Sequence, residues 1–130
     1  GPRGDRLYVI HDRSPYLTVY DAQQLTLVTR ARVTPGVGAI AVDRIRGLVL
    51  LGGPNQAAVE FVDPNALMPL YAMKTGGGVS YLAIVPDDNG FYMVSPDTRS
   101  LLVARLADRR VVTAIDVGDG PAWVAIMGEK

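Results

Sequence analysis

Few side chains of this 130-residue chain could perform nucleophilic or metal-assisted chemistry. Cysteine is absent, which excludes a thiol nucleophile, a thiolate metal site and a disulfide framework. The one histidine, His11, would need carboxylates or a second chain to complete a metal site. Asp12 follows it directly, but neighbours in sequence do not by themselves form an acid–base dyad. We interpret His11 first as a loop residue and second as a candidate ligand or base, and we predict no catalytic residue.

Other motifs with a chemical connotation have simpler structural explanations. The segment 87–90 and the pair Asp116/Asp119 carry oxygen ligands, but neither has the spacing of a calcium-binding loop, and turns commonly use Asp and Asn. The glycines 76–78 lack the lysine and the helix start of a phosphate-binding loop. The tripeptide at 3–5 reproduces an integrin-recognition sequence, which we attribute to chance. The sequence therefore predicts no metal and no cofactor.

The composition narrows the class of protein. Thirteen basic residues balance thirteen acidic ones, and this neutrality argues against a nucleic-acid partner. Hydrophobic residues make up 48%, too many for a disordered chain. The longest apolar run, residues 122–127, is far shorter than the ~20 residues of a membrane helix. The 14 glycines and 9 prolines favour many short strands within one domain.

An internal repeat organises these strands. Gly36, Gly78 and Gly120 are spaced 42 residues apart, and each opens a similar apolar stretch. Two further sets of apolar runs recur with them, namely 7–10, 48–51 and 91–94, and then 17–21, 59–63 and 103–107. The runs are short, rich in Val, Leu, Ile and Tyr, and separated by turn residues. The chain therefore consists of three copies of one unit that is nearly all strand.

Four strands in about 42 residues are typical of a β-propeller blade. The units resemble YVTN-type propeller repeats, whose name tetrad falls on Tyr8-Val9-Ile10-His11, with degenerate versions at 49–52 and 92–95. The Gly-x-Pro opening survives in part at 118–121 and 34–36. An aspartate ends the third strand at Asp21 and Asp63, whereas our alignment places Ala107 there in the last unit.

The resemblance implies an all-β fold of three four-stranded antiparallel propeller blades. We expect residues 1–4 to be a tag remnant or disordered tail, and the three-blade segment to span 5–130. Strands B, C and D of the first blade fall in 5–34, the second blade in 35–77, the third in 78–119, and a closing innermost strand A in 120–130. Three blades do not close a ring, so the chain is either half of a six-bladed homodimer or an excised part of a longer propeller.

The resemblance also implies a ligand face, formed by the loops that join strands D to A and B to C. Tyr81 and Trp123 hold equivalent positions in strand A, where they either line an aromatic channel mouth or, as we favour, pack between blades. The polar candidates for ligand binding on this face are His11, Arg13, Asn55 and Arg99.

The function expected from these observations is non-catalytic recognition of a protein or ligand and assembly, in the periplasm or outside the cell. The alternative is an enzyme resembling propeller hydrolases or lactonases, with a metal in the central channel.

Overall fold

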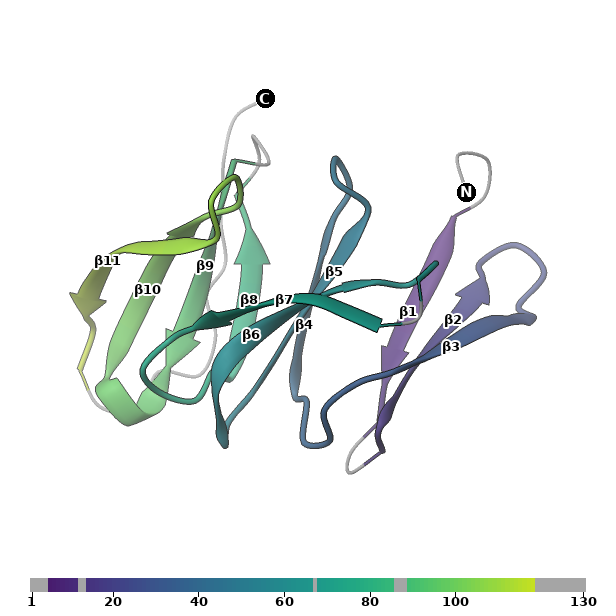
Figure 1. Ribbon diagram of the computed structural model, residues 1–130. Helices are drawn as coiled ribbons and strands as arrows, with labels where there is room; N and C mark the ends of the chain where they lie inside the picture. The colour runs from purple at the N-terminus through teal and green to yellow at the C-terminus, as the bar shows by residue number, and fades with distance from the viewer. Residues whose placement is uncertain (1–4, 12–13, 67, 86–88, 119–130) are drawn as a thin grey trace.

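The computed structural model describes residues 5–11, 14–66, 68–85 and 89–118. These residues form three antiparallel sheets and almost no helix (Figure 1). Sheet 1 contains β1 (Arg6–Ile10), β2 (Tyr16–Asp21) and β3 (Leu27–Arg32). Sheet 2 contains β4 (Ala39–Asp43), β5 (Leu48–Gly53), β6 (Gln56–Asp63) and β7 (Met68–Lys74). Sheet 3 contains β8 (Tyr81–Ile84), β9 (Gly90–Ser95), β10 (Ser100–Arg105) and β11 (Arg110–Asp116), with the short 3-10 helix η1 (Pro96–Thr98) before β10.

Each sheet is a simple meander whose strands lie in the order in which they occur in the chain. The three sheets follow one another across the molecule, with sheet 2 between the other two (Figure 1). The prediction of an all-β chain with three sheet units is confirmed at this level. The fourth strand predicted for the first sheet, within 120–130, lies outside the described residues. Among the described residues no helix is long and apolar enough to cross a membrane.

The sequence repeat is also a repeat of strand register. Residues 42 positions apart occupy the same place in successive sheets, as three pairs show: Val9–Thr18, Leu51–Glu60 and Met93–Leu102. This register corrects one detail of the sequence alignment. Arg105, and not Ala107, occupies the place that Asp21 and Asp63 hold in the first two sheets. Ala107 falls in the turn after β10.

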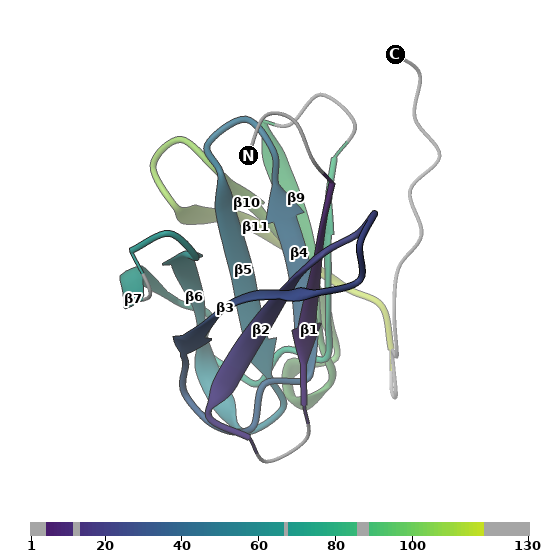
Figure 2. The ribbon, with the colours of Figure 1, turned by 90° about the vertical axis from the view of Figure 1, so that its right-hand side faces the viewer.

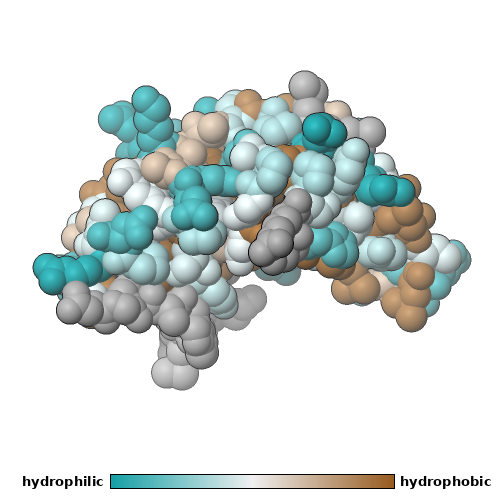
Figure 3. All heavy atoms as spheres, turned by 90° about the horizontal axis from the view of Figure 1, so that it is seen from below, coloured by the Kyte–Doolittle hydropathy of each residue, from teal (hydrophilic) through white to brown (hydrophobic). Residues whose placement is uncertain are grey.

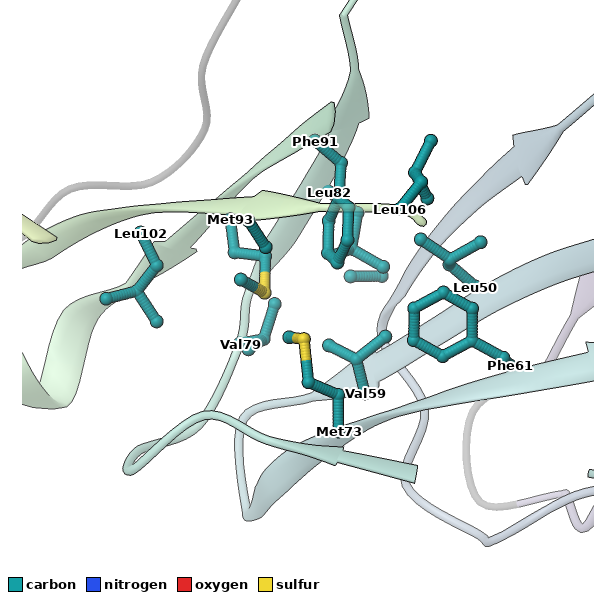
Figure 4. Packing of buried hydrophobic residues seen from close by; sticks show 12 residues of the cluster. Leu50, Val59, Phe61, Met73, Val79, Leu82, Phe91, Met93, Leu102 and Leu106 are labelled. Carbon is teal, nitrogen blue, oxygen red and sulfur yellow. The ribbon is translucent and has the colours of Figure 1, made fainter. Parts of the chain in front are cut away.

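Sheet 2 is buried on both faces because a neighbouring sheet covers each of them. Leu50 of β5 belongs to the core between sheets 2 and 3, where Phe61 and Phe91 meet edge to face with ring centroids 6.0 Å apart (Figure 4). Its neighbours Val49 and Leu51 belong to the core between sheets 1 and 2. A strand covered on both faces should be apolar without interruption, as predicted for the second strand of each unit and confirmed for β5.

The outermost strands are the exposed ones. Every residue of β11 is exposed, and β3 buries only Ala31. Arginines flank this alanine as Arg30 and Arg32, which agrees with the prediction of a charged outer strand. Charge at a free sheet edge discourages pairing with another chain.

Connections between sheets pass very close to turns within sheets. A Cβ on Gly78 would overlap the Pro54 carbonyl oxygen, and one on Gly53 would overlap the Gly36 carbonyl oxygen. The Val79 amide, next to Gly78, donates to the Gly53 carbonyl over 2.9 Å. Glycine is therefore required where the β7–β8 connection crosses the β5–β6 turn.

Candidate functional site

The largest cavity considered is a groove of about 640 Å³ between sheets 1 and 2. It opens at the end of the molecule that carries the β4–β5 and β6–β7 turns. Its floor is apolar and its rim charged, and the residues that line it are Asp5, Arg6, Tyr8, Val19, Thr29, Val42, Asp43, Arg44, Gly47, Leu48, Val49, Pro64 and Asn65. Cavities of this size hold small ligands in many proteins.

A second groove of about 320 Å³ occupies the corresponding place between sheets 2 and 3. The 42-residue register aligns Val19 of the first groove with Phe61 of the second, and Thr29 with Tyr71. Two aromatic rings thus stand where the larger groove has a valine and a threonine. This difference in side-chain size keeps the groove between sheets 1 and 2 open.

The carboxylate of Asp43 is an internal support of the larger groove. It is fully buried and accepts the backbone amides of Ile45 and Arg46 over 3.1 and 3.2 Å. The Arg46 guanidinium adds an ion pair at 3.1 Å. These three contacts order the β4–β5 turn, so Asp43 holds the rim of the groove in place. Asp5, Arg6 and Arg44 provide the remaining charges of the rim.

A stacked arginine marks the smaller groove. The guanidinium of Arg109 lies over the Tyr71 ring, 3.6 Å from its centroid. Arg109 adopts a left-handed backbone conformation with φ of 56°, which turns the chain back from β10 toward β11. Stacking on an aromatic face is a favourable environment for a guanidinium, and together the two side chains narrow this groove.

Aspartates stabilise the turns at this end of the molecule. Backbone amide bonds, first that of Gln24 and then that of Gln23, lower the pKa of Asp21 below its ordinary value of 3.8. In sheet 3 the Arg105 guanidinium donates to Asp108 over 2.7 Å and lowers the pKa of Asp108 below 3.8. An Arg–Asp pair therefore does in sheet 3 what Asp21 does alone in sheet 1.

The residues predicted from the sequence lie elsewhere. Most of the loops that carry them lie at the lower end in Figure 1, the face seen in Figure 3. Asn55 is exposed in the turn between β5 and β6. Arg99 follows η1 in a left-handed conformation and faces Asp116 at 3.9 Å. Arg13 and Trp123 lie outside the described residues, so their predicted roles remain predictions.

His11 is the predicted residue that lines a cavity. Its Nε2 lies 3.4 Å from the Thr18 hydroxyl, and both border a hollow of about 230 Å³ on the outer face of sheet 1, with Tyr16 and Arg30. Tyr81 begins β8 and pairs with Val94. Leu82, the next residue, points into the core toward sheet 2, so Tyr81 faces the opposite side of sheet 3. Within the described parts of the chain, no three His, Asp or Glu side chains gather as a metal site would require.

The sequence analysis missed the grooves at the β4–β5 end. It followed a resemblance that points to the opposite face. The available signal was a size difference at equivalent positions, Val19 against Phe61 and Thr29 against Tyr71, which becomes visible once the 42-residue register is known.

Comparisons with known proteins bear on the fold. No family model matches the sequence, and no curated protein matches it. Among solved structures, hydrazine synthase from Kuenenia stuttgartiensis is similar with a TM-score of 0.83 and 21% identity, over 95% of this chain and 36% of that one. At this identity the likeness concerns the arrangement of strands alone. The chain spans little more than a third of that neighbour.

Proposed function

We propose that the chain is a three-blade β-propeller segment that recognises a partner and assembles with further blades, without catalysing a reaction. The repeated register supports the blade interpretation, because each sheet buries the same kind of face against the next. The resemblance to YVTN-type repeats supports a location in the periplasm or outside the cell. Since one fold serves many functions, the recognition role must be argued from a site.

The open groove between sheets 1 and 2 is the observation that carries the proposal. Its apolar floor includes Val19 and Val49, which are almost completely buried, and its rim bears Asp5, Arg6 and Arg44. Such a lining suits a ligand with an apolar body and polar groups of both signs at its ends, as an extended peptide has. We expect the ligand to contact the floor first, because apolar burial supplies most of the driving force.

His11 and its cavity favour a second candidate function. An imidazole beside the Thr18 hydroxyl, in a hollow that also contains Arg30, could serve as a metal ligand or base in a hydrolase with a channel metal. Its metal site would need carboxylates from outside this cavity, because the residues that line it include no Asp or Glu.

Melting with added metal separates the two functions. The protein is melted alone and with Zn²⁺, Mn²⁺ or Ca²⁺, beside the variant His11→Ala. A metal that binds the native state must raise the melting temperature. We expect no increase that depends on His11. An increase in the wild type that His11→Ala abolishes would replace the recognition role by the metal-dependent one.

A further inference from the structure

Sheet 1 has one strand fewer than the other two sheets in the described structure. In sheets 2 and 3 a first strand, β4 or β8, pairs with the inner edge of β5 or β9. β1 holds the place of β5 and β9 in its own sheet, and its corresponding edge has no strand beside it among the described residues. The free edge of β1 therefore presents backbone donors and acceptors that the equivalent strands use for pairing.

The repeat defines what fits this edge. Residues 120–126 repeat the apolar stretches 36–42 and 78–84, which contain β4 and β8. In sheet 2 Ile40 pairs with Leu51, and in sheet 3 Leu82 pairs with Met93, each 42 residues further along. The same step places Val124 in the series of Ile40 and Leu82, and Val9 in the series of Leu51 and Met93.

We propose that the free edge of β1 binds residues 120–127 of a second copy of this chain as an antiparallel strand, with Val124 opposite Val9. This inference rests on the assembly role proposed above and specifies its partner and register. Two copies that exchange this strand reciprocally would form a closed ring of six sheets. A head-to-tail contact that does not close would form a filament instead.

The arrangement of the sheets favours a second copy over the same chain. Sheet 1 and sheet 3 lie at opposite ends of the row, with sheet 2 between them (Figures 1 and 2). Residue 118, the last one described, follows β11 of sheet 3. The segment after it would have to pass the whole row to reach β1 of its own chain, whereas sheet 1 of the next copy would lie directly beside it.

The face of sheet 1 that points away from sheet 2 supports the same partner. Leu7 on this face is 45% exposed, whereas the equivalent residues Val49 and Phe91 are 1% and 0% exposed against their neighbouring sheets. Tyr92 on the outward face of sheet 3 is equivalent to Leu50, which is buried against the next sheet. These two outer faces are thus of the kinds that already pack together twice within the chain.

The geometry of the pair permits a cysteine test in a protein that has no cysteine of its own. The Val85 amide donates to the Gly90 carbonyl over 2.9 Å, so pairs two residues apart alternate from this bond and Leu82–Met93 is a close, non-hydrogen-bonded pair. Val9–Val124 would inherit this parity, with Cα atoms roughly 4.5 Å apart. That separation allows a disulfide.

The experiment mixes two single variants, Val9→Cys and Val124→Cys, under mild oxidation. We expect a disulfide-linked species of twice 13.9 kDa on a non-reducing gel, which reduction returns to the monomer. The matched control mixes Val9→Cys with Ala125→Cys, which places the second thiol on the other face of the strand, and should give at least tenfold less product. Melting curves of each single variant establish that it folds.

Equal yields in the two mixtures, or no product from folded variants, would overturn the proposed register. If Val9→Cys does not fold, sedimentation of the wild type decides the matter, because a stable monomer at micromolar concentration would refute strand exchange. Failure here differs from failure of the recognition role. A monomer whose melting is insensitive to metal refutes only the exchange, whereas a His11-dependent metal effect refutes the recognition role whatever the gels show.

Discussion

Replacing Gly78 by alanine tests whether the sheets are locked together at their connections. The added Cβ would overlap the carbonyl oxygen of Pro54 and lie 2.5 Å from its carbonyl carbon. No positive φ is involved at Gly78, so the expected effect is one of space alone. The β5–β6 turn would have to move away, which weakens the 2.9 Å bond between the Val79 amide and the Gly53 carbonyl. Val79 is itself fully buried in the core between sheets 2 and 3.

The expected loss follows from these two contributions. Overpacking costs about 1–3 kcal/mol and a weakened backbone hydrogen bond about 1 kcal/mol, so we expect a loss of about 2–4 kcal/mol in the free energy of unfolding. For a chain of this length that corresponds to a fall of roughly 8–16 °C in the melting temperature. Thermal and urea unfolding followed by far-UV circular dichroism would measure both quantities.

Gly38→Ala is the matched control. Gly38 lies in the corresponding connection between sheets 1 and 2, where an added Cβ would meet only the Pro54 ring at 3.6 Å, an ordinary contact. Alanine there restricts the unfolded chain and should leave stability unchanged or raise it by about 0.4–1 kcal/mol. A Gly78→Ala loss no larger than that of Gly38→Ala would refute the close packing of connection and turn.

Three further outcomes are expected. Leu50→Asp should abolish cooperative unfolding, because it buries a charge between two sheets, whereas Lys74→Ala on the exposed outer strand of the same sheet should change stability by less than about 0.5 kcal/mol; equal losses would contradict this layering. Asp108→Asn should flatten the acid limb of a stability–pH curve: the folded-state pKa of Asp108 is lowered, so its contribution is present above pH 3.8 and is lost as the pH falls through the lower folded value, and an unchanged acid limb would contradict the Arg105 pair. Thr29→Tyr should partly fill the larger groove and raise the melting temperature by up to roughly 4 °C, whereas a fall would show that the groove is not the equivalent of the one that contains Tyr71.

The arrangement of strands was predictable because two periods specify it. Alternation along each strand and recurrence every 42 residues gave sheets 2 and 3 their strand order before any contact was known. The alignment of Ala107 with Asp21 and Asp63 failed for a definite reason. Residue similarity in the third unit is low, and the register is determined by turn lengths, which place Arg105 there. The turn then depends on the pair between Arg105 and Asp108.

The groove could not be predicted in the same way, because its volume depends on side chains that two sheets contribute. Val19 and Thr29 are ordinary strand residues in the sequence, and their significance appears only where Leu48 and Val49 of the next sheet stand opposite them. A repeat conserves the backbone frame, so any groove it makes is made again at each step. What differs from step to step, as between Thr29 and Tyr71, is therefore the best guide to which groove is free to bind. By the same reasoning the candidate binding residues of such a chain should be sought where it departs from its own repeat.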